Sequence, residues 1–75
     1  MYKIYNPILN GYSTGGRGFR FTKKGKVWSS LSDIRRHLNM VIERIEMYRG
    51  CEIHHYSETG VEEIPISVFF LYWSH

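Results

Sequence analysis

The residues best suited to do chemistry lie in a glycine-rich segment between Gly11 and Trp28, GYSTGGRGFRFTKKGKVW, which we call the basic stretch. It carries five of the ten Lys and Arg residues of the chain and no acidic residue. Cations contact phosphate groups and aromatic rings stack on bases, so this mixture is typical of a surface that binds nucleic acid or a nucleotide. The predicted ligand-binding residues are Tyr12, Gly15, Gly16, Arg17, Arg20, Lys23, Lys24 and Lys26.

The glycine run inside the basic stretch is a weaker indication of a phosphate site. Successive backbone N–H groups around Gly15, Gly16 and Gly18 can surround an anion. The established nucleotide-binding patterns are absent, because no G-x-x-x-x-G-K-[ST] occurs and no third glycine completes the Rossmann spacing. Two other interpretations stay open: a flexible turn ahead of a hairpin, and lysines that only keep a small protein in solution.

Other reactive side chains do not form a catalytic pattern. His54 and His55 are adjacent in a predicted strand, so their side chains point to opposite faces and cannot hold one ion together. Glu62 and Glu63 are separated in the same way, and Cys51 occupies an apolar position of its strand. We therefore predict no catalytic residues, no metal site and no cofactor, and a protein that is not an enzyme.

Composition and charge limit the classes of protein to which this chain can belong. The 75 residues predict a single domain, residues 1–75, and the lone cysteine excludes a disulfide within it. No apolar run reaches membrane-spanning length, which favours the cytoplasm. The net charge of +3 is divided: residues 1–32 hold six Lys and Arg and no acid, whereas residues 33–75 hold four Arg and seven acids. The chain is therefore expected to present one positive and one negative surface.

The elements that must position these residues begin with short strands. Residues 2–6 alternate and stop before Pro7, as a strand does. Residues 19–21 and 26–28 are predicted to form a hairpin that turns at Lys24-Gly25. In so small a domain, we expect at least two of the three rings of Phe19, Phe21 and Trp28 to lie in the core.

A helix over residues 31–49 follows, with Ser30 as its N-cap and Gly50 at its end. Apolar side chains recur at steps of three and four and form a stripe that Ile42 widens. The stripe consists of Leu31, Ile34, Leu38, Val41, Ile45 and Tyr48. Because each large buried side chain contributes about 1.5–3 kcal/mol, this helix is expected to anchor the fold.

Two strands are predicted after the helix, residues 51–57 and a longer one that reaches residue 73, with a turn at residues 58–60. The even positions of the last strand are expected to face the core. Its end, VFFLYW, is apolar on both sides and needs cover from the N-terminal segment or from a second copy of the chain. The predicted homo-oligomer surface consists of Val68, Phe69, Phe70, Leu71, Tyr72 and Trp73. The predicted fold is α+β, a small antiparallel sheet with one helix packed on one face, in the order β-β-β-α-β-β.

Three short segments, YSTGG at residues 12–16, FTKKGKVW at residues 21–28 and His37-Leu38 in the helix, resemble short proteins encoded by tailed bacteriophages. The resemblance covers about residues 12–38, with a looser match at residues 51–53. It implies a viral origin and a place in the host cytoplasm, but no particular chemistry. Small phage proteins of this kind act on host machinery by binding, in host takeover or counter-defence.

We therefore expect a non-enzymatic phage accessory protein that binds nucleic acid or a nucleotide through the basic stretch. One alternative is an inhibitor of a host defence or replication protein, bound through the same cations or through the aromatic C-terminus. Another is a structural subunit that assembles into homo-oligomers.

Overall fold

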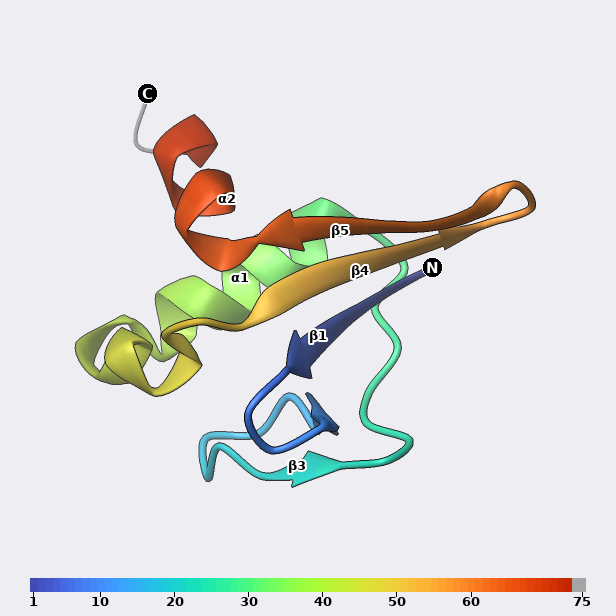
Figure 1. Cartoon of the computed structure of the whole chain (residues 1–75). Coiled ribbons are helices and arrows are strands. Elements are labelled where there is room, and N and C mark those ends of the chain that lie inside the picture. The colour runs from blue at the N-terminus through green and yellow to red at the C-terminus, as the bar shows by residue number, and fades with distance from the viewer. Residues whose placement is uncertain (74–75) are drawn as a thin grey trace.

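The computed structural model describes residues 1–73, with side chains described as far as Phe69. A five-stranded antiparallel sheet in the order β3-β2-β1-β4-β5 is its main element (Figure 1). The strands are β1 Tyr2–Asn6, β2 Gly11–Ser13, β3 Phe21–Thr22, β4 Glu52–Ser57 and β5 Gly60–Pro65. The helical elements are α1 Leu31–Met40, the 3-10 helix η1 Ile42–Tyr48 and α2 Ile66–Trp73. The expected α+β class, with a small antiparallel sheet and a helix, is confirmed.

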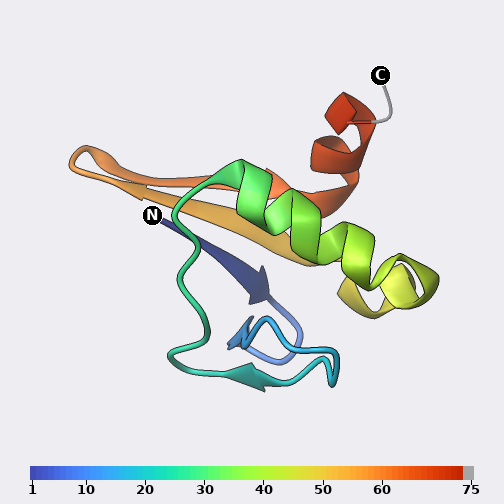
Figure 2. The same cartoon turned by 180° about the vertical axis from the view of Figure 1, so that it is seen from behind.

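The N-terminal strand lies at the centre of the sheet. β1 pairs with β2 on one side and with β4 on the other, where Ile4 is opposite Ile53. At the start of β1, on the side away from β4, Tyr2 exchanges two backbone hydrogen bonds with Trp28, at 2.9 and 2.8 Å. Viewed from behind, α1 lies across one face of the sheet (Figure 2). The opposite face carries no helix in the described part of the chain, and we call it the open face.

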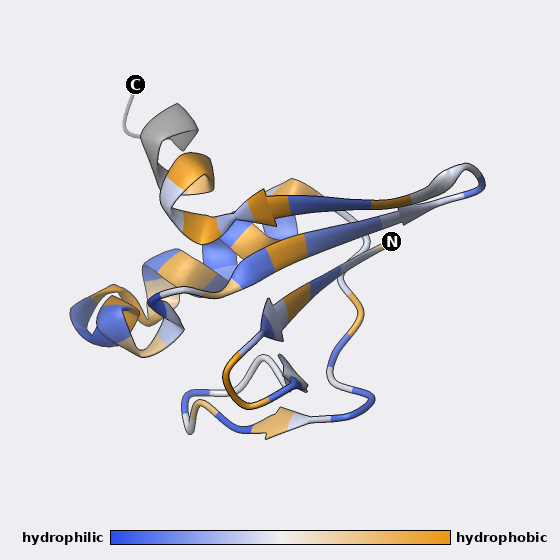
Figure 3. Ribbon diagram, viewed as in Figure 1, coloured by the Kyte–Doolittle hydropathy of each residue, from blue (hydrophilic) through white to orange (hydrophobic). Residues whose placement is uncertain are grey.

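The core lies between α1 and the sheet. Ile4, Ile53, Ile34 and Leu38 are each fully buried there. Figure 3 shows apolar bands along β4 and β5 separated by polar stretches. Ile53 of β4 is paired with Ile64 of β5 on the core face, and because successive strand residues face opposite sides, the next pair, His54 and Glu63, lies on the open face.

The helix begins as expected and ends earlier than expected. The Ser30 side chain accepts a hydrogen bond from the Asp33 backbone N–H at 3.2 Å, so Ser30 is the N-cap. The α-helix stops at Met40, and the chain continues as a 3-10 helix with a non-helical Arg44 inside it. After the break Ile42 points outward, with 48% exposure, whereas Tyr48 is fully buried, as expected from the apolar stripe. The predicted continuous helix over residues 31–49 and the predicted burial of Ile42 are therefore wrong.

The predicted hairpin in the basic stretch is also wrong. Residues 11–13, which look like a turn in the sequence, form β2, and Ser13 pairs with Phe21 of β3. Trp28 bridges to Tyr2 instead of pairing with the strand predicted at residues 19–21. The expectation for the rings is confirmed, because Phe19 and Trp28 are buried and Phe21 packs against the core. The short β2 was missed because a three-residue strand next to glycine carries almost no periodic signal.

The last predicted strand ends at Pro65, and residues 66–73 form α2. The Ile66 N–H donates to the Cys51 carbonyl at 3.0 Å, and the chain turns into the helix at this point. Ile66 is buried, but Val68 is 43% exposed, so the even positions do not share a core face. A short apolar run has no period that separates a strand from a helix, which explains the error.

The predicted homo-oligomer surface falls largely outside the described side chains. Phe69 packs against the core, whereas the side chains of residues 70–73 lie outside the described part. No helix in the described residues is long and apolar enough to cross a membrane.

Candidate functional site

The open face holds a group of rings from three strands, which we call the tyrosine–histidine cluster: Tyr5 of β1, Tyr12 of β2, and His54 and Tyr56 of β4. The Tyr5 ring stacks on His54 with centroids 4.8 Å apart and tilts against Tyr12 at 5.1 Å. His54 is 7% exposed although no helix covers it, because the neighbouring rings do. The three tyrosines are half-buried, so parts of their rings are accessible from solvent.

The hydroxyl groups of the cluster are hydrogen-bonded to one another and to the adjacent loop. Tyr56 donates to the Tyr12 hydroxyl at 2.9 Å, and Tyr5 donates to the Asn10 side-chain carbonyl. Burial, together with the hydrogen bond to Tyr12, raises the pKa of Tyr56 to about 12. The Tyr56 hydroxyl therefore stays protonated at neutral pH and remains a donor.

Lys3 links the cluster to the basic stretch. Its ammonium group lies over the Tyr12 ring, 4.8 Å from the centroid, in a cation–π arrangement. The same group donates to the Lys24 backbone carbonyl at 2.8 Å. A ring accessible from solvent thus meets Lys3 and the Lys24 backbone at the β1–β2–β3 end of the open face.

The cations of the basic stretch lie in the segments before and after β3. All five predicted ones are exposed: Arg17, Arg20, Lys23, Lys24 and Lys26. None of them is ion-paired with an acid among the described residues. Their positive charge is therefore available to an anionic partner. Lys26 also lies over the Trp28 ring at 5.3 Å, which holds its stem against the core.

The two predicted loop glycines differ in role. Gly15 has φ +78, and a Cβ there would lie 2.6 Å from the Lys26 Cδ, so a side chain is excluded by both conformation and space. Its N–H donates to the Ser13 hydroxyl at 3.1 Å and so faces inward. Gly16 is exposed, with no atom closer than 4.0 Å to a Cβ built there. A phosphate at this loop would thus use the Gly16 region and not the Gly15 amide.

Three buried polar side chains next to this loop are hydrogen-bonded in series, and we call them the Ser13–Tyr48–His37 network. The Tyr48 hydroxyl is 2.8 Å from the Ser13 Oγ and 2.7 Å from the His37 Nε2, and all three side chains are buried. Burial lowers the pKa of His37, and the charge of Lys26 lowers it further, so the imidazole is neutral at pH 7. A neutral Nε2 that accepts from Tyr48 leaves the Tyr48 oxygen to accept from Ser13, which satisfies every group.

A cavity of about 470 Å³ lies between the basic stretch and α1. Lys26 and Arg36 supply positive charge to its wall, and Gly15, Trp28 and His37 also line it. Asp33 is the acid in the lining, and it is already engaged by the Ser29 hydroxyl at 2.9 Å and by Arg36 at 3.8 Å. The cavity has the charge and size to hold a phosphate-bearing small molecule.

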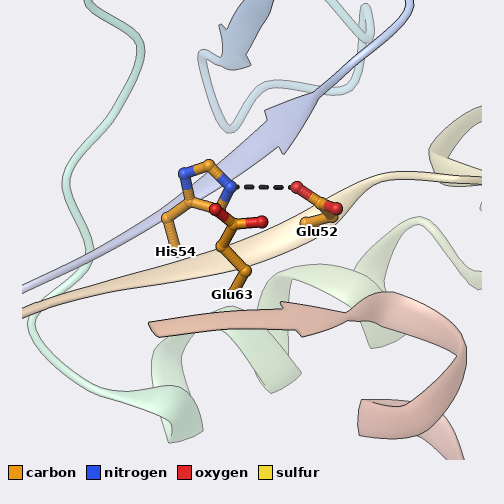
Figure 4. Close-up of side chains that lie close together, drawn as sticks. All are labelled: Glu52, His54 and Glu63. Atoms are coloured by element: carbon orange, nitrogen blue, oxygen red, sulfur yellow. Dashed lines mark hydrogen bonds and ion pairs between the residues drawn. The ribbon is translucent and has the colours of Figure 1, made fainter. Parts of the chain in front are cut away.

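The sequence missed one group of potential ligand atoms. Glu52 and His54 of β4 and Glu63 of β5 point toward one another (Figure 4). Glu52 and His54 are two residues apart in a strand, and His54 is directly opposite Glu63 in the ladder. The sequence shows which residues are adjacent, whereas the pairing of His54 with Glu63 across two strands depends on the β4–β5 register. The sequence pattern that indicates such a group is Glu-x-His in one strand, followed in the next strand of the hairpin by an acid opposite the histidine.

No family model, curated protein or solved structure matches this chain.

Proposed function

We propose that this chain is a non-enzymatic accessory protein of a tailed bacteriophage that binds single-stranded nucleic acid. The contact surface consists of the cations of the basic stretch and the adjoining tyrosine–histidine cluster. The observation that carries the proposal is the placement of Lys3 between the Tyr12 ring and Lys24, since it joins rings and cations into one surface. The viral origin is supported by the resemblance of residues 12–38 to phage proteins.

The cations supply the affinity in this proposal. The five exposed Lys and Arg side chains follow one another over residues 17–26, so a flexible phosphate backbone can reach them together. A single strand whose phosphates pair with five cations loses affinity with a logarithmic salt slope of about −3.5. Binding should therefore weaken about 100-fold between roughly 50 and 200 mM salt.

The rings select single strands over duplexes. Bases in a duplex are stacked on each other, whereas unpaired bases can stack on exposed tyrosine faces. Each such stack contributes about 1–3 kcal/mol by alanine substitution. Tyr12 is suited to this role because its position is fixed by the Tyr56 hydrogen bond before any ligand arrives.

The test is fluorescence anisotropy with a labelled single-stranded oligonucleotide at several salt concentrations. We expect the steep salt dependence above, and strong loss of binding for Lys23→Glu with Lys24→Glu. The matched control is Arg35→Glu with Arg49→Glu. It changes the net charge by the same amount as the first double variant, but the substituted residues lie in α1 and at the end of η1, outside the basic stretch. A flat salt response, or equal losses for the two double variants, would contradict the proposal.

A free nucleotide is a second candidate ligand, favoured by the cavity that Lys26 and Arg36 border. In that case Lys26→Gln and Arg36→Gln should each weaken the binding of a nucleoside triphosphate, while Lys23→Gln should not. Equilibrium dialysis with a labelled nucleotide measures this difference. Equal effects of all three variants would show that the cavity does not select the ligand.

A further inference from the structure

We propose that Glu52, His54 and Glu63 form a binding site for one zinc ion at the β4–β5 end of the open face. One ligand atom from each residue, a nitrogen from His54 and an oxygen from each glutamate, lies within 4.8 Å of the others. The three side chains come from two hydrogen-bonded strands whose register fixes them on the same face. The proposal does not rest on nucleic-acid binding, although His54 belongs both to this site and to the tyrosine–histidine cluster.

The distances suit a tetrahedral ion. Zinc lies about 2.0–2.2 Å from nitrogen and oxygen ligands, so two ligand atoms of one tetrahedral site are about 3.3–3.5 Å apart. The His54 Nε2 is already 3.1 Å from the Glu52 Oε1. Glu63 is exposed, and rotation of its side chain can bring its carboxylate to the same separation without moving the backbone.

The imidazole is held in place before an ion arrives. The His54 side chain is 9% exposed, with Tyr5 stacked on its ring and the Tyr12 ring meeting it at 6.0 Å. Its Nε2 is directed toward the two carboxylates (Figure 4). A site whose least mobile ligand is fixed by packing loses less conformational entropy when an ion binds.

The charge of the site also calls for a cation. Glu52 and Glu63 have no ion pair with Lys or Arg among the described residues. The nearest cation along the ladder, Lys3, is opposite His54 but is directed to Tyr12 and the Lys24 carbonyl. The His54–Glu52 hydrogen bond explains the position of Glu52, and the β4–β5 register places Glu63 opposite His54.

The donor set favours zinc over magnesium or calcium. Magnesium and calcium prefer oxygen ligands alone, whereas zinc binds imidazole nitrogen together with carboxylate oxygen. Three protein ligands leave a fourth position of the tetrahedron for a water molecule.

The experiment is a titration of the full chain with zinc chloride by isothermal calorimetry, with native mass spectrometry for stoichiometry. We expect one ion per chain, and Glu63→Gln should weaken binding by more than about 10-fold, the loss that removal of an outer-shell partner already causes. Glu62→Gln is the matched control, because Glu62 is the neighbouring exposed acid on the opposite face of β5. It should bind zinc as the wild type does.

A second measurement keeps the test independent of calorimetric fitting. In NMR spectra of the imidazole nitrogens, zinc should shift the His54 Nε2 resonance and leave the buried His37 unchanged, and a chelator should reverse the shift. Absence of saturable binding would overturn the proposal. So would equal affinities of Glu63→Gln and Glu62→Gln, or a shift confined to His55.

Discussion

Replacing Tyr48 with Phe tests the Ser13–Tyr48–His37 network most directly. The substitution keeps the buried ring, which packs edge-on against Phe19 at 5.1 Å, and removes only the hydroxyl. Two hydrogen bonds disappear, those to Ser13 and His37. Losing such a bond costs about 1 kcal/mol when the remaining group keeps another partner, and about 1–2 kcal/mol in all when a buried group is left without one.

The expected loss can be worked out group by group. Ser13 keeps one partner, because its Oγ still accepts from the Gly15 N–H, whereas the His37 Nε2 loses the hydroxyl next to it. We therefore expect the free energy of unfolding to fall by about 2–3 kcal/mol. A chain of 75 residues has about 4–11 kcal/mol of total stability, so the loss is a large part of it.

Urea denaturation followed by Trp28 fluorescence is a suitable assay, because Trp28 is buried with its ring 5.7 Å from that of His37. With a slope of about 1 kcal/mol/M for so small a domain, the midpoint should fall by about 2 M. The control is Tyr5→Phe, which removes a hydroxyl from the half-buried open face and should change the midpoint much less. A midpoint shift for Tyr48→Phe no larger than that of the control would refute the assigned role of the network.

Three further predictions concern other residues. Lowering the pH below 6.5 should destabilise the fold, because the unfolded chain then binds a proton at His37 that the folded chain, with its lowered pKa, binds only at lower pH. Urea midpoints at about pH 7.5 and 5.5, with the His37 imidazole followed by NMR, check this; a His37 titration at or above 6.5 would contradict it. Gly25→Ala should lower the urea midpoint substantially, since φ is +63 and the new Cβ would lie 2.3 Å from the Tyr12 Cβ; an unchanged midpoint would show that the loop moves freely. Cys51 should react with a thiol reagent only as fast as the fold opens, because burial, with a lesser effect of Glu52, raises its pKa to about 11; rapid reaction in the native state, timed by absorbance, would be the opposite result.

Local signals predicted the parts of the fold that local interactions determine. Ser30 and Asp33 marked the start of α1 because capping involves residues three apart. Pro7 marked the end of β1, which stops at Asn6. Neither the break after Met40 nor the helical state of residues 66–73 could be predicted, because no glycine or proline marks the break and a short apolar run fits a strand and a helix equally well.

The candidate site divides in the same way. The exposure of the cations could be predicted from their charge alone. Tyr12 could be predicted as a ligand-binding residue only because it belongs to the basic stretch. Its ring neighbours come from β1 and β4, and only the strand order β2-β1-β4 brings them together. The Glu52–His54–Glu63 group also depends on the register of β4 against β5. A shift of that register by one residue would separate Glu63 from His54.

The central position of β1 has a consequence for how the chain folds. Two units can form from neighbouring segments, the β1–β2 pair and the β4–β5 hairpin. The pairing of β1 with β4 that joins them requires closure of the long loop between the two ends of the chain, and such closure slows folding. During synthesis β1 leaves the ribosome well before β4, so the sheet becomes continuous only after β4 has been made. Until then the edge of β1 that faces β4 stays unpaired.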